Sequence, residues 1–170
     1  MRNYCTYFDS SFIVRGLTLY RSLVEESAAF TLWVLCLDDA TYDTVIKLNA
    51  QGLQPIRIAD LESAYPELRN VKAQSARTDY FFYYLPALPA YVLKQDPAMR
   101  TITFLDADLY FFSDPDTILN EMTANSVLIL EHRFPTALQN IRKFGRFKIG
   151  FLSFRNDEAG RGFLENWRSQ

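Results

Sequence analysis

The sequence has few of the residues that build disulfide frameworks or zinc sites. It contains two cysteines, Cys5 and Cys36, and one histidine, His132. Both cysteines lie in apolar, strand-like runs, and neither belongs to a C-x-x-C motif or a Cys/His cluster. This usage excludes a disulfide scaffold and a zinc cluster, and it predicts two reduced core thiols in a cytoplasmic protein.

An excess of positive charge is also missing. The 18 Lys and Arg residues face 20 Asp and Glu residues, which gives a net charge of -2 and excludes a broad basic surface for nucleic acid. The longest apolar stretch, residues 81–93, is shorter than the ~20 residues that cross a bilayer and contains Pro86 and Pro89. The N-terminus lacks the apolar segment of a secretory signal. We therefore expect no transmembrane segment and no nucleic-acid partner.

What is present is enough apolar volume for one compact domain. Hydrophobic residues make up 49% of the 170 residues and aromatic residues 15%, which excludes disorder for the chain as a whole. No repeat or Gly/Ser-rich linker divides the sequence, so residues 1–170 are interpreted as a single domain. The oligomeric state is not predictable from these features.

Apolar runs alternate with amphipathic segments along the chain. Strands are expected at residues 5–8, 30–37, 54–58, 101–105 and 126–130. Helices are expected after Asp9, with Ile13, Leu17, Tyr20 and Val24 on its apolar face, after Asp38, and over residues 77–94 and 157–170. This alternation predicts an α/β fold with a mostly parallel sheet. Because the last helix runs to Gln170 without a closing turn or strand, we expect the chain to be C-terminally incomplete.

Two carboxylates, Asp106 and Asp108, follow the apolar strand at residues 101–105. In extended backbone, residues i and i+2 point to one face, so both carboxylates can share one cation. Hard oxygen ligands suit Mg²⁺ or Mn²⁺, which complete their shells with water and substrate phosphates. The carboxyl end of a strand is also where open α/β sheets bind ligands. The structural alternative is an acidic loop that caps a helix.

Several segments in order resemble the nucleotide-diphospho-sugar glycosyltransferases with the GT-A fold, most closely family 8. Asp106-Ala-Asp108 resembles the family's Asp-x-Asp motif, and Thr6-Tyr-Phe-Asp9 resembles its nucleotide-binding opening. Arg77 matches the family's arginine, and the segment from Phe147 through Gly150 resembles its Asn-x-Gly strand. The resemblance covers nearly the whole chain, and it implies a GT-A type, Rossmann-like three-layer α/β/α sandwich.

The resemblance also implies roles for individual residues. Asp108 would bind Mn²⁺ or Mg²⁺ directly, and Asp106 would share the metal or hold the donor ribose. The nucleotide-binding residues would be Tyr7 and Asp9, near the base, and Arg77, near the donor phosphates or supporting Asp106. Lys148 and Gly150 are candidate contacts for sugar or acceptor, although Lys148 replaces the family's Asn. The family's third metal ligand, a distant His, has no counterpart before the end of the sequence.

Structural interpretations compete with some of these assignments. Asp9 is equally explained as the cap of the first helix, and Arg77 as a structural ion-pair partner. His132 has no partner cluster and is placed outside the metal site. The basic residues of segment 142–148 are interpreted as a solvated loop. The aromatic run from Phe81 to Tyr84 is expected to pack in the core, with one ring available to stack on a sugar.

Three functions remain in competition. The first is a metal-dependent glycosyltransferase that moves a sugar from a nucleotide-diphosphate sugar, a UDP-hexose by resemblance, to a glycan or other small acceptor with retention. The second is a haloacid-dehalogenase-type Mg²⁺ phosphotransferase, which usually carries its Asp-x-Asp near the N-terminus. The third is a non-catalytic nucleotide-sugar-binding fragment. Nucleotidylyltransferases have a similar sheet but need a Gly-rich, basic opening, and the stretch from Thr6 to Arg15 contains no glycine.

Overall fold

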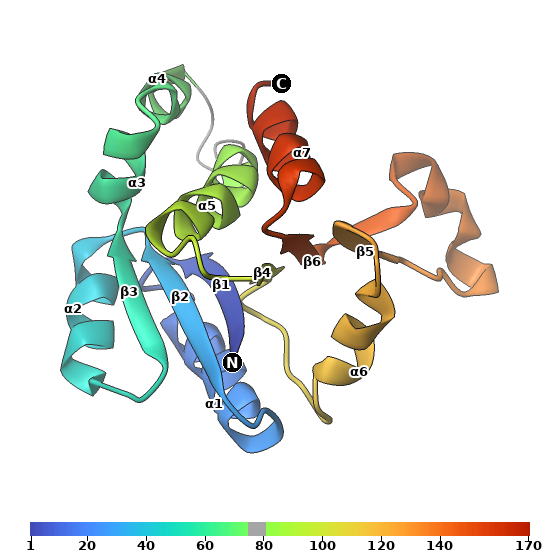
Figure 1. Cartoon of the computed structure of the whole chain (residues 1–170), viewed down its shortest axis with the longest axis horizontal. Coiled ribbons are helices and arrows are strands. Elements are labelled where there is room, and N and C mark those ends of the chain that lie inside the picture. The colour runs from blue at the N-terminus through green and yellow to red at the C-terminus, as the bar shows by residue number, and fades with distance from the viewer. Residues whose placement is uncertain (75–80) are drawn as a thin grey trace.

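A computed structural model describes residues 1–74 and 81–170 of the chain (Figure 1). The strands are β1 Arg2–Phe8, β2 Phe30–Cys36, β3 Leu53–Arg57, β4 Thr101–Leu105, β5 Val127–Glu131 and β6 Phe147–Arg155. The helices are α1 Ile13–Glu26, α2 Asp39–Leu48, α3 Ile58–Ala64, α4 Glu67–Gln74, α5 Phe81–Gln95, α6 Asp116–Leu119 and α7 Glu158–Arg168. Two 3₁₀ segments, η1 Asn120–Met122 and η2 Thr136–Phe144, complete the described elements.

The strands form one six-stranded sheet in the order β3-β2-β1-β4-β6-β5. The pairs β2·β3, β1·β2 and β1·β4 are parallel, whereas β6 runs antiparallel to both β4 and β5. The buried hydroxyl of Thr103 donates to Ser153 Oγ at 2.9 Å across the β4·β6 pair. The predicted mostly parallel sheet is confirmed, with β6 as the reversed strand.

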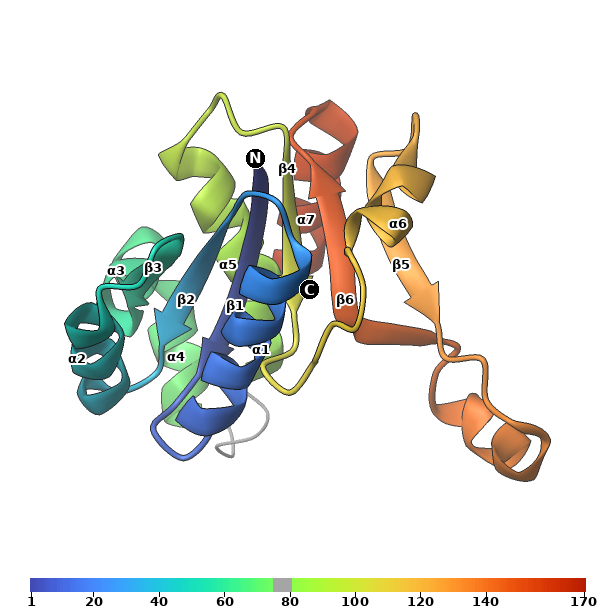
Figure 2. The same ribbon diagram turned by 90° about the horizontal axis from the view of Figure 1, so that it is seen from below.

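Helices cover both faces of this sheet (Figures 1 and 2). One face packs in a hydrophobic cluster with side chains of α3, α4, α5 and α7, including Leu88 and Leu164. The opposite face packs in a second cluster with side chains of α1, α2 and α6, including Leu19 and Val45. The fold is therefore the expected three-layer α/β/α sandwich, and both thiols, Cys5 and Cys36, are buried within it.

The first helix differs from expectation in two ways. Asp9 does not cap it, because α1 begins after Phe12 and its N-cap position makes no side-chain capping hydrogen bond. Its buried face consists of Gly16, Leu19, Ser22 and Leu23, while the expected core residue Val24 is 52% exposed. The face is rotated because Gly16 lies directly on the Phe8 ring, where a Cβ would overlap the ring atoms. Close backbone approach therefore decides which side of α1 faces the sheet.

Two other helix starts match the sequence. Asp38 caps α2 by accepting a hydrogen bond from the Thr41 backbone N–H at 2.8 Å. Asp157 caps α7 by accepting one from the Gly160 backbone N–H at 2.8 Å. The predicted aromatic helix is confirmed from Phe81 onward as α5, whereas the short helices α3 and α4 were not predicted.

No helix in the described ranges 1–74 and 81–170 is long and apolar enough to span a lipid bilayer. The longest apolar segment forms α5, which packs against β4 and α7 with most of its side chains buried. Its hydrophobicity is explained by burial between the sheet and other helices.

Candidate functional site

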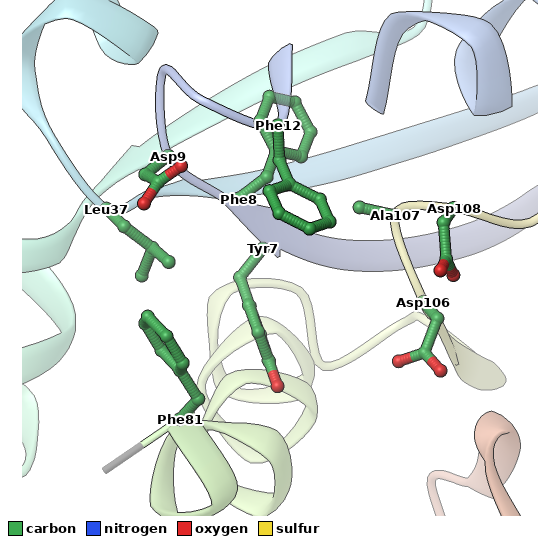
Figure 3. A pocket seen from close by; sticks show the side chains of 9 residues that line it. All are labelled: Tyr7, Phe8, Asp9, Phe12, Leu37, Phe81, Asp106, Ala107 and Asp108. Atoms are coloured by element: carbon green, nitrogen blue, oxygen red, sulfur yellow. The ribbon is translucent and has the colours of Figure 1, made fainter. Parts of the chain in front are cut away.

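A pocket of about 280 Å³ lies at the carboxyl ends of β1 and β4 (Figure 3). These two strands are parallel neighbours, so the residues that follow them meet at one edge of the sheet. The lining combines an aromatic side with an acidic side and consists of Tyr7, Phe8, Asp9, Phe12, Leu37, Phe81, Asp106, Ala107 and Asp108. Four of the predicted site residues, Tyr7, Asp9, Asp106 and Asp108, are thus brought together.

Asp106 and Asp108 lie in a tight turn rather than in extended backbone. The Leu109 N–H donates to the Asp106 carbonyl at 3.1 Å, and β4 already ends at Leu105. The expectation that strand alternation places both carboxylates on one face was therefore wrong. The turn nevertheless keeps both side chains on the pocket, Asp106 half-buried and Asp108 exposed (Figure 3).

The two carboxylates influence each other electrostatically. Burial raises the pKa of Asp106, and the negative charge of Asp108 raises it further. The positive charge of Lys148 opposes this shift and lowers the Asp106 pKa. The site therefore holds two like charges that a cation would stabilise in their ionised form.

Strand β6 packs directly against Asp106. The Asp106 N–H donates to the Gly150 carbonyl at 2.9 Å. A Cβ on Gly150 would overlap Asp106 Oδ2, and it would lie 3.0 Å from Asp106 Cγ and 3.2 Å from Lys148 Cε. Lys148 and Gly150, expected near sugar or acceptor, therefore lie beside Asp106, although neither lines the pocket itself. Only glycine leaves room for the carboxylate at this point.

An aromatic wall stands opposite the carboxylates. The Tyr7 ring stacks on Phe81 with centroids 5.9 Å apart and an angle of 20° between the planes, and it packs on Phe104 at 5.4 Å. Burial raises the pKa of Tyr7, with a further contribution from the charge of Asp106. Phe81 and Phe12 line the pocket but were not among the predicted site residues. The aromatic run that begins at Phe81 was the available signal for the first of them.

Asp9 lies at the pocket as the first residue after β1. Its Oδ1 accepts hydrogen bonds from the Ser11 N–H at 3.0 Å and from the Ser11 hydroxyl at 2.5 Å. This is an Asx turn that shapes the loop between β1 and α1. The structure thus gives Asp9 a local role different from the expected helix cap, with its side chain on the pocket lining (Figure 3).

The remaining predictions fall elsewhere. Arg77 lies outside the described residues. The exposed His132 stacks on Phe134 with centroids 4.5 Å apart, in the connection between β5 and β6. Among residues 1–74 and 81–170, no group of three or more carboxylate, His or Cys side chains is placed to hold a metal ion together. The pair Asp106 and Asp108 fits a hard divalent cation that takes its other ligands from water and phosphate.

No protein-family model matches this sequence. The chain is 28% identical to YfnF and 26% identical to YfnD of Bacillus subtilis (strain 168), both described as uncharacterized. Each match covers 98% of this chain, which spans 57% of YfnF and 53% of YfnD. The chain thus covers a little over half the length of these curated relatives.

Solved structures identify the fold. Mouse xyloside xylosyltransferase 1 superposes with a TM-score of 0.62 at 14% identity, over 99% of this chain and 74% of that one. The galactosyltransferase LgtC, solved with donor and acceptor sugar analogues, superposes with a TM-score of 0.58 at 11% identity, over 99% of this chain and 64% of that one. This chain has the GT-A fold.

The same fold also occurs in another enzyme class. The 4-diphosphocytidyl-2C-methyl-D-erythritol synthase of Anaerococcus prevotii superposes with a TM-score of 0.59 at 9% identity, over 100% of this chain and 76% of that one. Sugar transfer and nucleotide chemistry both use this architecture, so the site residues must decide between them.

Proposed function

We propose that this chain is the nucleotide-sugar-binding part of a metal-dependent glycosyltransferase, most similar to family 8. The donor would be a UDP-hexose, the acceptor a glycan or other small molecule, and transfer would proceed with retention. The supporting observation is the Asp106–Asp108 turn beside an aromatic-walled pocket at the carboxyl edge of a GT-A sheet.

The carboxylates are the proposed metal and donor ligands. Asp108, the more exposed of the two, would bind Mn²⁺ or Mg²⁺ directly, and Asp106 would share the ion or accept from the donor ribose. When bound, such an ion offsets the negative charge that develops on the departing nucleoside diphosphate. It would also relieve the repulsion that raises the Asp106 pKa.

The aromatic wall is the proposed nucleotide-binding surface. Tyr7 and Phe81 present a stacked pair of rings to the pocket, and Phe12 adds a third ring (Figure 3). Flat apolar surfaces of this kind bind the π-face of a base, while Asp9 lies at the same edge. Arg77 is retained in the proposal on the family resemblance alone, as a residue near the donor phosphates or supporting Asp106.

Lys148 and Gly150 are proposed to face the sugar side of the site. The Lys148 stem approaches the same point above Gly150 as the Asp106 carboxylate. An ammonium group here would attract the diphosphate or an anionic group of the acceptor. An uncharged Asn would supply hydrogen bonds without that charge, so Lys148 marks a difference from the family pattern.

Nucleotidyl transfer is the second candidate, favoured by the structural similarity to the cytidyl-group synthase. Its reaction would release pyrophosphate from a nucleoside triphosphate. The lack of glycine between Thr6 and Arg15 weighs against it, because backbone N–H groups of glycine-rich loops commonly hold triphosphates.

The deciding experiment incubates the chain with UDP-glucose, UDP-galactose or CTP, with and without Mn²⁺, and measures released UDP or pyrophosphate. Because the chain spans only about half the length of its relatives, we expect slow, Mn²⁺-dependent hydrolysis of the donor sugar to water, with UDP release that Asp108→Asn abolishes. The control is Asp43→Asn, an exposed carboxylate on α2.

Other outcomes would change the assignment. Pyrophosphate release from CTP would favour nucleotidyl transfer. Phosphate release from simple phosphoesters, or metal-independent turnover, would contradict the proposal. UDP binding without any turnover would instead favour the non-catalytic binding fragment.

A further inference from the structure

Residues 131–148, here called the basic arm, comprise the last residue of β5, the connection that contains the 3₁₀ segment η2, and the first two residues of β6. In Figure 2 this connection extends away from the sheet and its covering helices. None of its described side chains is buried; all are exposed or partly exposed. Among its described residues, the basic arm therefore contributes no side chain to either hydrophobic cluster.

The charge of the basic arm is opposite to that of the rest of the chain. It holds five of the chain's 18 Lys and Arg residues but one of its 20 Asp and Glu residues. The remaining residues carry 13 basic against 19 acidic side chains. The small net charge of -2 is therefore the sum of a positive segment and an acidic remainder of the chain.

The single acidic residue of the basic arm organises its base. Glu131 accepts from Arg146 Nε at 2.9 Å and lies 3.6 Å from an Arg142 nitrogen. These contacts tie both arginines to the end of β5 and hold the pKa of Glu131 below its usual range. The basic arm as a whole carries four more positive than negative side chains.

Apolar side chains accompany these charges. A 3₁₀ helix has three residues per turn, so Leu138 and Ile141 lie on one face of η2. Leu138 is 46% exposed, and Phe147 at the start of β6 is 48% exposed. Neighbouring exposed apolar and basic side chains on a segment outside the core are typical of an interaction surface.

We propose that the basic arm binds the surface of an anionic lipid bilayer. Basic side chains attract acidic headgroups, and apolar side chains beside them enter the boundary between headgroups and acyl chains. An acidic protein partner would pair with the basic side chains but would leave the exposed Leu138 and Phe147 without a role. An anionic bilayer would bind both the basic and the apolar side chains. This inference shares only Lys148 with the proposed sugar-transfer site and does not depend on sugar transfer.

Vesicle flotation tests the proposal with the 170-residue chain. We expect the chain to float with phosphatidylcholine vesicles containing about one-third phosphatidylglycerol, and not with phosphatidylcholine alone. Raising the salt concentration should weaken binding, because exposed charges are screened. Equal binding to both vesicle types, or binding to neither, would overturn the proposal.

Two double variants test separately how the basic side chains and the apolar side chains contribute to vesicle binding. Arg142→Glu with Lys143→Glu should weaken binding to the anionic vesicles by about tenfold or more. Leu138→Ser with Ile141→Ser should also weaken binding to these vesicles. The binding that this variant retains should be more sensitive to salt, because it depends on charge alone. The matched control reverses two exposed basic residues of the body, Lys47→Glu with Arg100→Glu, and should bind the vesicles as the unmodified chain does.

A second copy of the chain is the competing occupant. Sedimentation velocity without lipid should show the same oligomeric state for the unmodified chain and for the Leu138→Ser/Ile141→Ser variant. Self-association that this variant abolishes would assign the apolar face to a second copy and overturn the bilayer proposal. Circular dichroism of each variant should match the unmodified chain, since the substituted side chains are not buried.

Discussion

The two halves of the sheet differ in how completely they are covered. In the parallel half, β4 has four buried residues out of five, and helices pack on both faces. In the antiparallel half, β6 still buries five of its nine residues, whereas the edge strand β5 has no buried residue and leads into the exposed basic arm. Parallel strands need cover on both faces, whereas antiparallel strands can leave one side in water.

The candidate site lies on the boundary between these halves. Asp106 and Asp108 follow β4 in the parallel half, while the buried Gly150 and the exposed Lys148 belong to β6 in the antiparallel half. The buried strand β4 thus positions the carboxylates, and the neighbouring strand β6 places Lys148 beside Asp106.

Core truncation should show the largest contrast between the halves. Phe104→Ala in β4 removes a ring that is 1% exposed, and should lower the free energy of unfolding by about 3–5 kcal/mol. Leu138→Ala in the basic arm should change it by about 0.5 kcal/mol or less. Urea denaturation followed by circular dichroism measures both values. Similar losses for the two variants would contradict the division into covered and exposed halves.

An added methyl group at the boundary should affect binding more than folding. Gly150→Ala places a Cβ against the Asp106 carboxylate, and should weaken Mn²⁺-dependent UDP binding by about tenfold. The control Gly162→Ala lies in α7 with nothing within 4 Å of the new Cβ. It should leave UDP affinity unchanged and stabilise the helix by about 0.5–1 kcal/mol. Calorimetric titration would reject the arrangement if both variants bound UDP equally.

The smallest expected effect is a pH-dependent change at Asp106. The pKa of Asp106 is higher in the folded state than in the unfolded state. The free energy of unfolding therefore falls as the pH rises from the unfolded pKa through the folded pKa, because the folded state resists ionisation of this carboxyl. Asp106→Asn should therefore raise the free energy of unfolding at about pH 7 and have little effect at about pH 3, where the carboxyl is protonated in both states. Urea denaturation at both pH values measures this, with Asp43→Asn as the control. A gain of equal size at both pH values would contradict this assignment.

The sequence predicted most of the parallel half because its signals are local. The apolar run from Phe30 predicted β2 from residue type alone. Asp38 predicted the start of α2, and the structure contains the corresponding capping hydrogen bond. The Asp-x-Asp position at the end of β4 followed from the apolar run before it. These features depend on hydrophobicity and short-range hydrogen bonds, which the sequence displays directly.

The rest depended on contacts between distant segments. The buried face of α1 is set by Gly16 against Phe8, and periodicity alone favoured a face that included the exposed Val24. Phe81 and Phe12 reach the pocket only because α5 and the loop after β1 meet there. The turn at Asp106 depends partly on the backbone bond to Gly150 in β6. Such placements follow from tertiary packing rather than from local pattern.

The most direct test of the central claim is calorimetric titration of the chain with UDP in the presence and absence of Mn²⁺. The account predicts that Mn²⁺ strengthens UDP binding, because the phosphates complete a coordination shell that two carboxylates begin. Asp108→Asn should remove this gain and lower the Mn²⁺-dependent affinity by about tenfold or more, while Asp43→Asn should retain it. Equal Mn²⁺-dependent affinity for the unmodified chain and Asp108→Asn would contradict the claim that the Asp106–Asp108 turn binds a metal–diphosphate group.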